Sequence, residues 1–125
     1  MIEDIRGVLD DVVDRLLRLP ESRLSGGGPD GRTVARAGHE VAQRLADTAA
    51  GVEHRQAPTP PELRAVPWLG PFVVAHQVAV TGADLLAAGV GLDASVGVWV
   101  DASRHDLGAA LADCTALLRE FRSRL

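Results

Sequence analysis

The chain has 125 residues, of which 46% are hydrophobic and 24% charged, and its formal net charge is −4. A chain of this length and composition forms one domain with its own core, which excludes disorder and predicts a single domain over residues 1–125. All the basic residues are Arg, and they form no basic stripe, so we do not expect nucleic acid as a partner. The single cysteine excludes an internal disulfide.

The N-terminal residues do not resemble a secretion signal, because charged residues such as Glu3, Asp4 and Arg6 interrupt the apolar ones. We therefore expect a cytoplasmic protein. The longest nearly uninterrupted apolar run, Pro71 to Ala88, would be about 27 Å long as a helix. Its polar residues would have to lie in lipid, so a buried core helix is favoured over a membrane span, and no membrane partner is expected.

The first half of the chain predicts two helices separated by a glycine-rich connection. Apolar residues recur in steps of three and four from Ile2 to Leu19, and Pro20 ends this helix. Residues 21–31 lack both a preceding strand and a phosphate-loop pattern, so we interpret them as a flexible surface loop. A second helix is predicted from Asp30 or Thr33 to about Glu53, with one of those two residues as its cap.

The second half predicts two more helices. Residues 54–67 include Pro58, Pro60 and Pro61 and should be extended, after which Trp68 folds over the bundle end and Pro71 begins the third helix. The short apolar stretch 96–100 is too short to found a sheet, so we expect a loop with Trp99 packed on the core. The fourth helix should run from about residue 103 or 104 to about Arg124.

Four amphipathic helices of this length predict an all-α fold, namely an antiparallel four-helix bundle with long loops that carry Trp68 and Trp99. On a helical wheel, the core face of the third helix should consist of six residues: Phe72, Ala75, Ala79, Gly82, Ala83 and Leu86. Further apolar residues widen this arc beyond what a lone bundle requires. The surplus should meet the Trp-bearing loops, a second copy of the chain or a different partner.

The polar groups of the third helix are the main candidates for a binding site. Gln77, Thr81 and Asp84 form a narrow polar strip, which is more typical of a solvated face than of a site. His76 falls inside the apolar arc, where a buried imidazole would need a partner. A satisfied core histidine is favoured, and a ligand-facing or interface role is the alternative.

Other candidate chemistry is weak. No two histidines lie three or four residues apart and no E-x-x-H motif occurs, so we expect neither a metal site nor a cofactor. His39 is predicted on the surface, and Gly82 is expected to allow close approach of the second helix. Cys114 lies in the apolar stripe of the fourth helix, where burial should make its thiol inert.

The leading hypothesis is a small helical-bundle binding or accessory protein without chemistry of its own, acting as a homodimer or through a protein partner. The alternative is a small-molecule-binding or enzymatic bundle, so the sequence leaves enzymatic activity open. Its pocket, suited to a small apolar ligand, would lie around His76 and draw on five further residues: Gln77, Thr81, Asp84, Trp68 and Trp99.

Overall fold

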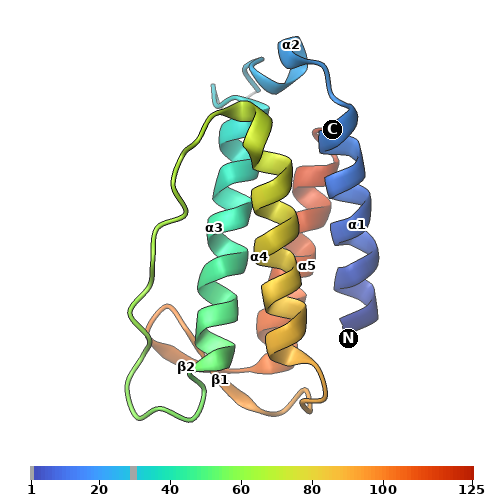
Figure 1. Cartoon of the computed structure of the whole chain (residues 1–125). Coiled ribbons are helices and arrows are strands. Elements are labelled where there is room, and N and C mark those ends of the chain that lie inside the picture. Colours follow the sequence, from blue (N-terminus) through green and yellow to red (C-terminus); the bar gives the residue numbers. More distant parts are fainter. Residues whose placement is uncertain (1, 29–30) are drawn as a thin grey trace.

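A computed structural model describes residues 2–28 and 31–125. Its elements in chain order are α1 (Ile2–Arg18), α2 (Glu21–Leu24), α3 (Val34–Glu53), the 3₁₀-helix η1 (Pro71–Val73), α4 (Val74–Gly89), β1 (Gly97–Val100), β2 (Ser103–Asp106) and α5 (Leu107–Arg122). The four long helices lie side by side, with the two strands at one end of them and α2 at the other (Figure 1).

The predicted antiparallel four-helix bundle is wrong in two respects. The fold is mainly helical, but the described residues also form a two-stranded antiparallel sheet and the additional short helix α2. In addition, α3 and α4 pack against each other while running in the same direction, and α1 and α5 run the opposite way (Figure 1). The arrangement is therefore up, down, down, up rather than strictly alternating.

The long connection between α3 and α4 makes the parallel pair possible. Residues 54–70, which we call the crossover segment, are extended for most of their length and lie outside the helices (Figure 1). Residues 60–70, when extended, can span about 36 Å, whereas a 20-residue helix such as α3 is about 30 Å long. The chain can therefore return to the end of the molecule where α3 began before α4 starts.

Residues 96–100 belong to a β-hairpin rather than to the expected loop. Val100 pairs with Ser103, so the turn consists of Asp101 and Ala102, both of which have positive φ angles. Two consecutive residues of this kind are the signature of a type I′ turn, which matches the twist of a hairpin. Turn geometry thus allows two four-residue strands to pair where the run length alone argued against a sheet.

The hairpin packs closely on the C-terminal half of α3. A Cβ atom added to Gly51 would lie 1.8 Å from the carbonyl oxygen of Trp99, so this contact requires glycine. The indole Nε1 of Trp99 donates a hydrogen bond to the carbonyl of Ala57 at 3.3 Å. The prediction that Trp99 packs on the core is therefore wrong: Val98 is the hairpin residue that is fully buried, and the Trp99 indole bonds to the crossover segment.

The connection before α3 is more ordered than the predicted flexible loop. It contains the short helix α2 and an isolated bridge between Gly27 and Thr33. The hydroxyl of Thr33 accepts a hydrogen bond from the backbone N–H of Arg36 at 3.0 Å, which confirms Thr33 as the helix cap. The alternative cap, Asp30, lies outside the described residues.

The core lies mainly between the four long helices and consists of Leu, Val, Ile and Ala with one Phe and one Cys. Gly82 was expected to admit the second helix, but its neighbour is Leu9 of α1, whose side chain would lie 2.4 Å from an added Cβ atom. The most completely buried large side chains are Ile5, Val12, Leu45, Val52, Val74, Val78, Leu85, Val98, Leu107, Leu111 and Leu118.

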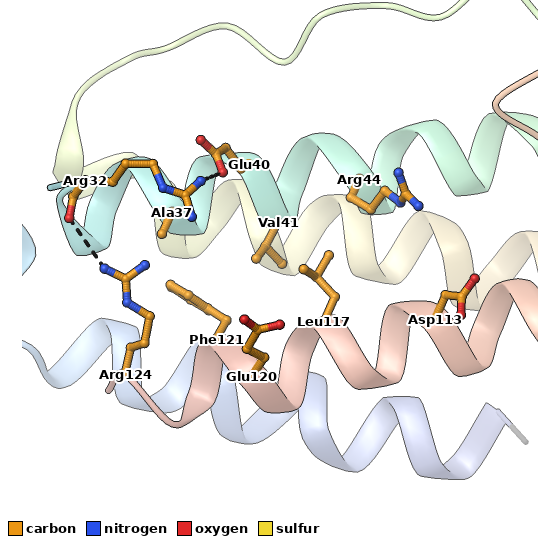
Figure 2. Close-up of a pocket in the computed structure, with 10 residues that line it drawn as sticks. All are labelled: Arg32, Ala37, Glu40, Val41, Arg44, Asp113, Leu117, Glu120, Phe121 and Arg124. Carbon is orange, nitrogen blue, oxygen red and sulfur yellow. Dashed lines mark hydrogen bonds and ion pairs between the residues drawn. The ribbon is translucent and has the colours of Figure 1, made fainter. Parts of the chain in front are cut away.

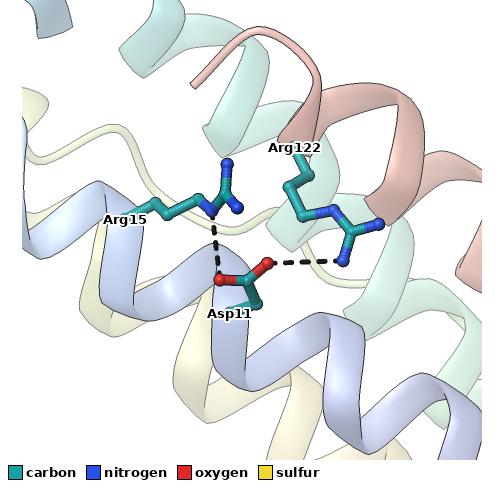
Figure 3. A network of polar contacts seen from close by, with 3 residues as sticks. All are labelled: Asp11, Arg15 and Arg122. Atoms are coloured by element: carbon teal, nitrogen blue, oxygen red, sulfur yellow. Dashed lines mark hydrogen bonds and ion pairs between the residues drawn. The ribbon is translucent and has the colours of Figure 1, made fainter.

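A polar contact joins the first and last helices of the chain. Asp11 of α1 accepts hydrogen bonds from Arg15 at 3.0 Å and from Arg122 of α5 at 3.3 Å (Figure 3). The hydrogen bond from Arg15, with the positive charges of both guanidinium groups, lowers the pKa of the Asp11 carboxyl below its ordinary value of 3.8. The three side chains are partly exposed, so the contact orients α1 on α5 more than it stabilises the fold.

Candidate functional site

Helix α4 is turned differently from the orientation that the wheel predicted. Of the predicted core face, Phe72 and Ala83 are exposed, and Phe72 retains 66% of its surface. His76 is also exposed, so the expectation of a buried histidine is wrong. Ala75, Gly82 and Leu86 are buried as the wheel predicted, and Val74, Val78 and Leu85, each fully buried, join them on the core side. Because the helix is apolar almost all round, polarity did not define its inner side.

The predicted polar strip does not form one surface. Thr81 is buried, and its hydroxyl donates to the carbonyl of Gln77 at 2.8 Å within the same helix. The side-chain amide of Gln77 donates to the carbonyl of Pro67 in the crossover segment at 2.7 Å. Its own oxygen, Oε1, is buried and has no hydrogen-bond partner in the described part of the chain. These two residues hold the structure together and do not face a common cavity.

Asp84 is exposed at the edge of an open cavity of about 700 Å³ between α3, α4 and the crossover segment. Alanines of α3 line part of this cavity, together with Asp47 and Glu53 from α3 and Glu62 and Arg64 from the crossover segment. The described residues contain no group of three or more His, Cys, Asp or Glu side chains arranged to hold a metal ion. The acidic side chains of this cavity are therefore too dispersed for metal coordination.

Trp68 packs near the beginning of α3. The guanidinium carbon of Arg36 lies 3.7 Å from the centre of its ring system, and the imidazole of His39 meets it edge-on at 5.6 Å between centroids. His39 is half-buried, and its Nε2 lies 2.7 Å from the carbonyl oxygen of Val66. The prediction of a simple surface histidine is therefore wrong, because His39 fastens the crossover segment to α3.

Trp99 lies at the other end of α3, with the guanidinium carbon of Arg104 4.8 Å from its ring centre. The partners of Trp68 on α3 are Arg36 and His39, whereas Trp99 contacts Gly51. Twelve or more residues of helix separate them, about 18 Å along the axis. The structure does not bring the two tryptophans and His76 together, so the six predicted site residues do not line one pocket.

A second groove, which the sequence did not indicate, lies between α3 and α5 (Figure 2). It has a volume of about 420 Å³, and its floor is apolar, with Val41 and Phe121 among its residues. Charged side chains of both signs surround this floor (Figure 2). Arg32 forms an ion pair with Glu40, which occupies part of the rim. The groove is open and its rim charges are mixed, so it favours no particular ligand charge.

The most distinctive surface is the exposed side of η1 and α4. We call it the outer face of α4. Five of the six large hydrophobic side chains that are exposed among the described residues lie on this side or beside it, the sixth being Leu63 of the crossover segment. The face comprises Phe72, His76, Val80, Ala83, Asp84 and Ala87 along the helix and Val90 directly after it, with Leu17 beside Phe72 and Leu69 just before η1.

This face extends onto α1 at one end. Leu17 of α1, 56% exposed, lines a small cleft together with Phe72 and Pro71. By length and composition η1 and α4 together could cross a membrane, as the core helices of many soluble proteins could, and 44% of this stretch is buried within the fold. The exposed residues of this stretch belong to the outer face. Sequence reasoning recognised the surplus apolar surface on this helix but placed Phe72 on the wrong side of it.

Comparisons of the chain with protein-family models, with curated proteins and with solved structures found no match.

Cys114 is buried in α5, as predicted. Its thiol donates to the hydroxyl of Thr48 at 3.4 Å, and burial raises the pKa of the Cys114 thiol above its ordinary value of 9.0. A thiol that remains protonated and inaccessible is a poor nucleophile. This residue belongs to the core and not to a site.

Proposed function

We propose that this chain acts by binding protein, and that the outer face of α4 is the contact surface. The observation that carries the proposal is the clustering of exposed large hydrophobic side chains on and beside this helix. Phe72, Val80 and Val90 each retain 60% or more of their surface. Scattered exposed apolar residues are ordinary, but a contiguous stripe along one helix is typical of an interaction surface.

The chemistry of the face supports a protein partner over a small molecule. The face is convex and follows one helix, whereas small-molecule sites are concave. Its centre is apolar and its polar members, His76 and Asp84, lie among apolar side chains, as in the centre and rim of protein interfaces. The partner is either a second copy of this chain or a different protein, and the chain serves as an accessory or self-associating subunit.

Affinity capture with a tagged chain tests this proposal. The wild-type chain is compared with Phe72→Ser and Val80→Ser, which remove apolar surface from the outer face, and with the matched control Leu63→Ser on the crossover segment. Circular dichroism verifies that each variant folds. We expect the wild type and L63S to retain a protein that F72S and V80S lose, whether an untagged copy or another chain. Equal retention by all four proteins, or retention by none, would refute the proposal.

A further inference from the structure

Two polar residues are placed symmetrically on the outer face of α4. His76 and Asp84 are both exposed, and each lies four residues from Val80, one on either side of it. Along the helix axis each is therefore about 6 Å from Val80. On the helical wheel they also lie at equal angles, about 40°, on the two sides of Val80. The face thus has a hydrogen-bond donor and an acceptor placed symmetrically about an apolar centre.

Building on the proposed function, we infer that the partner is a second copy of this chain, whose α4 packs antiparallel against the first with Val80 at the two-fold axis. In such a pair, residues that lie equally far before and after Val80 in the helix are brought to the same height, one from each copy. His76 then lies opposite the partner's Asp84, and Asp84 opposite the partner's His76. The face supplies both halves of two identical contacts.

Charge complementarity is what favours this arrangement over others. An imidazole donates an N–H to a carboxylate in either of its charge states, so the His76 contact to the partner's Asp84 is favourable throughout the neutral range. A parallel pair would instead place each carboxylate beside its own copy, which is unfavourable for like charges. The antiparallel register is the one that satisfies both polar residues.

The side-chain sizes along the face agree with the same register. Phe72 lies about 12 Å from Val80, so it reaches the height of the partner's Ala88, whose small side chain leaves room for the ring. Ala83 and Ala87 have small side chains, so they allow the axes of two packed helices to come close together. A 16-residue helix covers less than a standard interface of about 800 Å² per partner, so we expect a weak dimer rather than an obligate one.

Sedimentation over a concentration series, from about 1 µM to about 500 µM, measures the dimerisation of the untagged chain in the range expected for a small interface. The wild type should dimerise reversibly. His76→Asp places a carboxylate opposite the partner's Asp84, and the dissociation constant should rise about tenfold or more. The exchanged double variant, His76→Asp with Asp84→His, recreates both contacts and should return to within about threefold of the wild type. If the double variant dimerises no more tightly than H76D, the pairing of His76 with the partner's Asp84 is refuted.

Disulfide formation tests the register directly. The cysteine of Val80→Cys lies at the axis, next to its own copy, and should oxidise to a covalent dimer. The cysteine of Phe72→Cys would lie about 24 Å from its copy, beyond the 7 Å that a disulfide allows between Cα atoms. Leu63→Cys provides the rate for an exposed thiol outside the face, and the native Cys114 is buried. Equal cross-linking of V80C and F72C would indicate a parallel pair and refute the inference.

The two proposals can fail separately. A chain that stays monomeric throughout the concentration series refutes the second-copy inference, even if it still captures another protein in a manner that F72S and V80S abolish. That second result would leave the proposed function standing. The absence of any capture that depends on the outer face would refute both.

Discussion

The imidazole Nε2 of His39 and the carbonyl oxygen of Val66 lie 2.7 Å apart although 27 residues separate them in the chain. This contact holds the crossover segment against α3. One turn along the helix, Gln43 Oε1 accepts from the backbone N–H of Val66 at 2.7 Å, and its Nε2 donates to the carbonyl of Arg64 at 3.0 Å. Two side chains of α3 thus satisfy backbone groups of a segment that belongs to no helix or sheet.

We predict that Gln43→Ala loosens the crossover segment without unfolding the helices, because it removes two of the hydrogen bonds that fasten this segment. Trypsin cleavage after the exposed Arg64 should become several times faster, while the melting temperature changes little. Gln56→Ala, a change of the same kind at an exposed residue of this segment, is the control and should cleave at the wild-type rate. An unchanged cleavage rate for Q43A would show that the other contacts suffice.

Glycine substitutions should have opposite effects at two helical positions. Gly51→Ala places a Cβ atom 1.8 Å from the Trp99 carbonyl oxygen, so the hairpin must move, and we expect a loss of more than about 2 kcal/mol in the free energy of unfolding. Gly7 lies in α1 with no neighbouring atom within 4 Å of an added Cβ, so Gly7→Ala should gain about 0.5–1 kcal/mol. Urea denaturation of both variants measures these values, and a neutral G51A would contradict the close packing of Trp99.

The contact between Asp11 and the two arginines should appear in the pH dependence of stability. The pKa of Asp11 is lowered in the folded state, so its stabilising contribution is present above the ordinary value of 3.8 and is lost as the pH falls through the folded-state value. Asp11→Asn should therefore lower the melting temperature at pH 7 and have no such effect at acidic pH, where the wild-type carboxyl is protonated. Asp10→Asn changes the net charge equally at the neighbouring exposed residue. The same pH profile for D10N would assign the effect to net charge alone.

Cys114 should be unreactive in the folded protein. An aromatic disulfide reagent should modify it at least about 100-fold more slowly than the exposed cysteine of Leu63→Cys, since reaction requires opening of the core.

The raised pKa of the Cys114 thiol also predicts a dependence of stability on pH. The stability that burial of the neutral thiol supports is complete below the ordinary value of 9.0 and declines as the pH rises from there towards the folded-state pKa. Cys114→Ala should show a flatter decline over this alkaline range, and rapid modification of native Cys114 would contradict its burial.

Local sequence signals determined most of the helices of this protein. The spacing of Ile5, Leu9, Val12 and Leu16 predicts the buried side of α1, and all four are buried. Pro20 and the Thr33 cap mark where α1 has ended and where α3 begins. The burial of Cys114 follows from the stripe on α5 in the same way. Each of these features depends on residues within a few turns of one another, where periodicity and capping act directly.

Only the tertiary structure decided the direction of α4 and the side that it buries. The crossover segment is long enough for either direction, and the choice rests on contacts such as His39 with Val66 that join distant residues. Because α4 is apolar almost all round, its inner side depends on which side chains fit against α1 and α3. Val74, Val78 and Leu85 occupy that space, whereas Phe72 and His76 lie outside. A helix without a polar side does not specify its own orientation, since burial on either side would be favourable and packing has to choose between them.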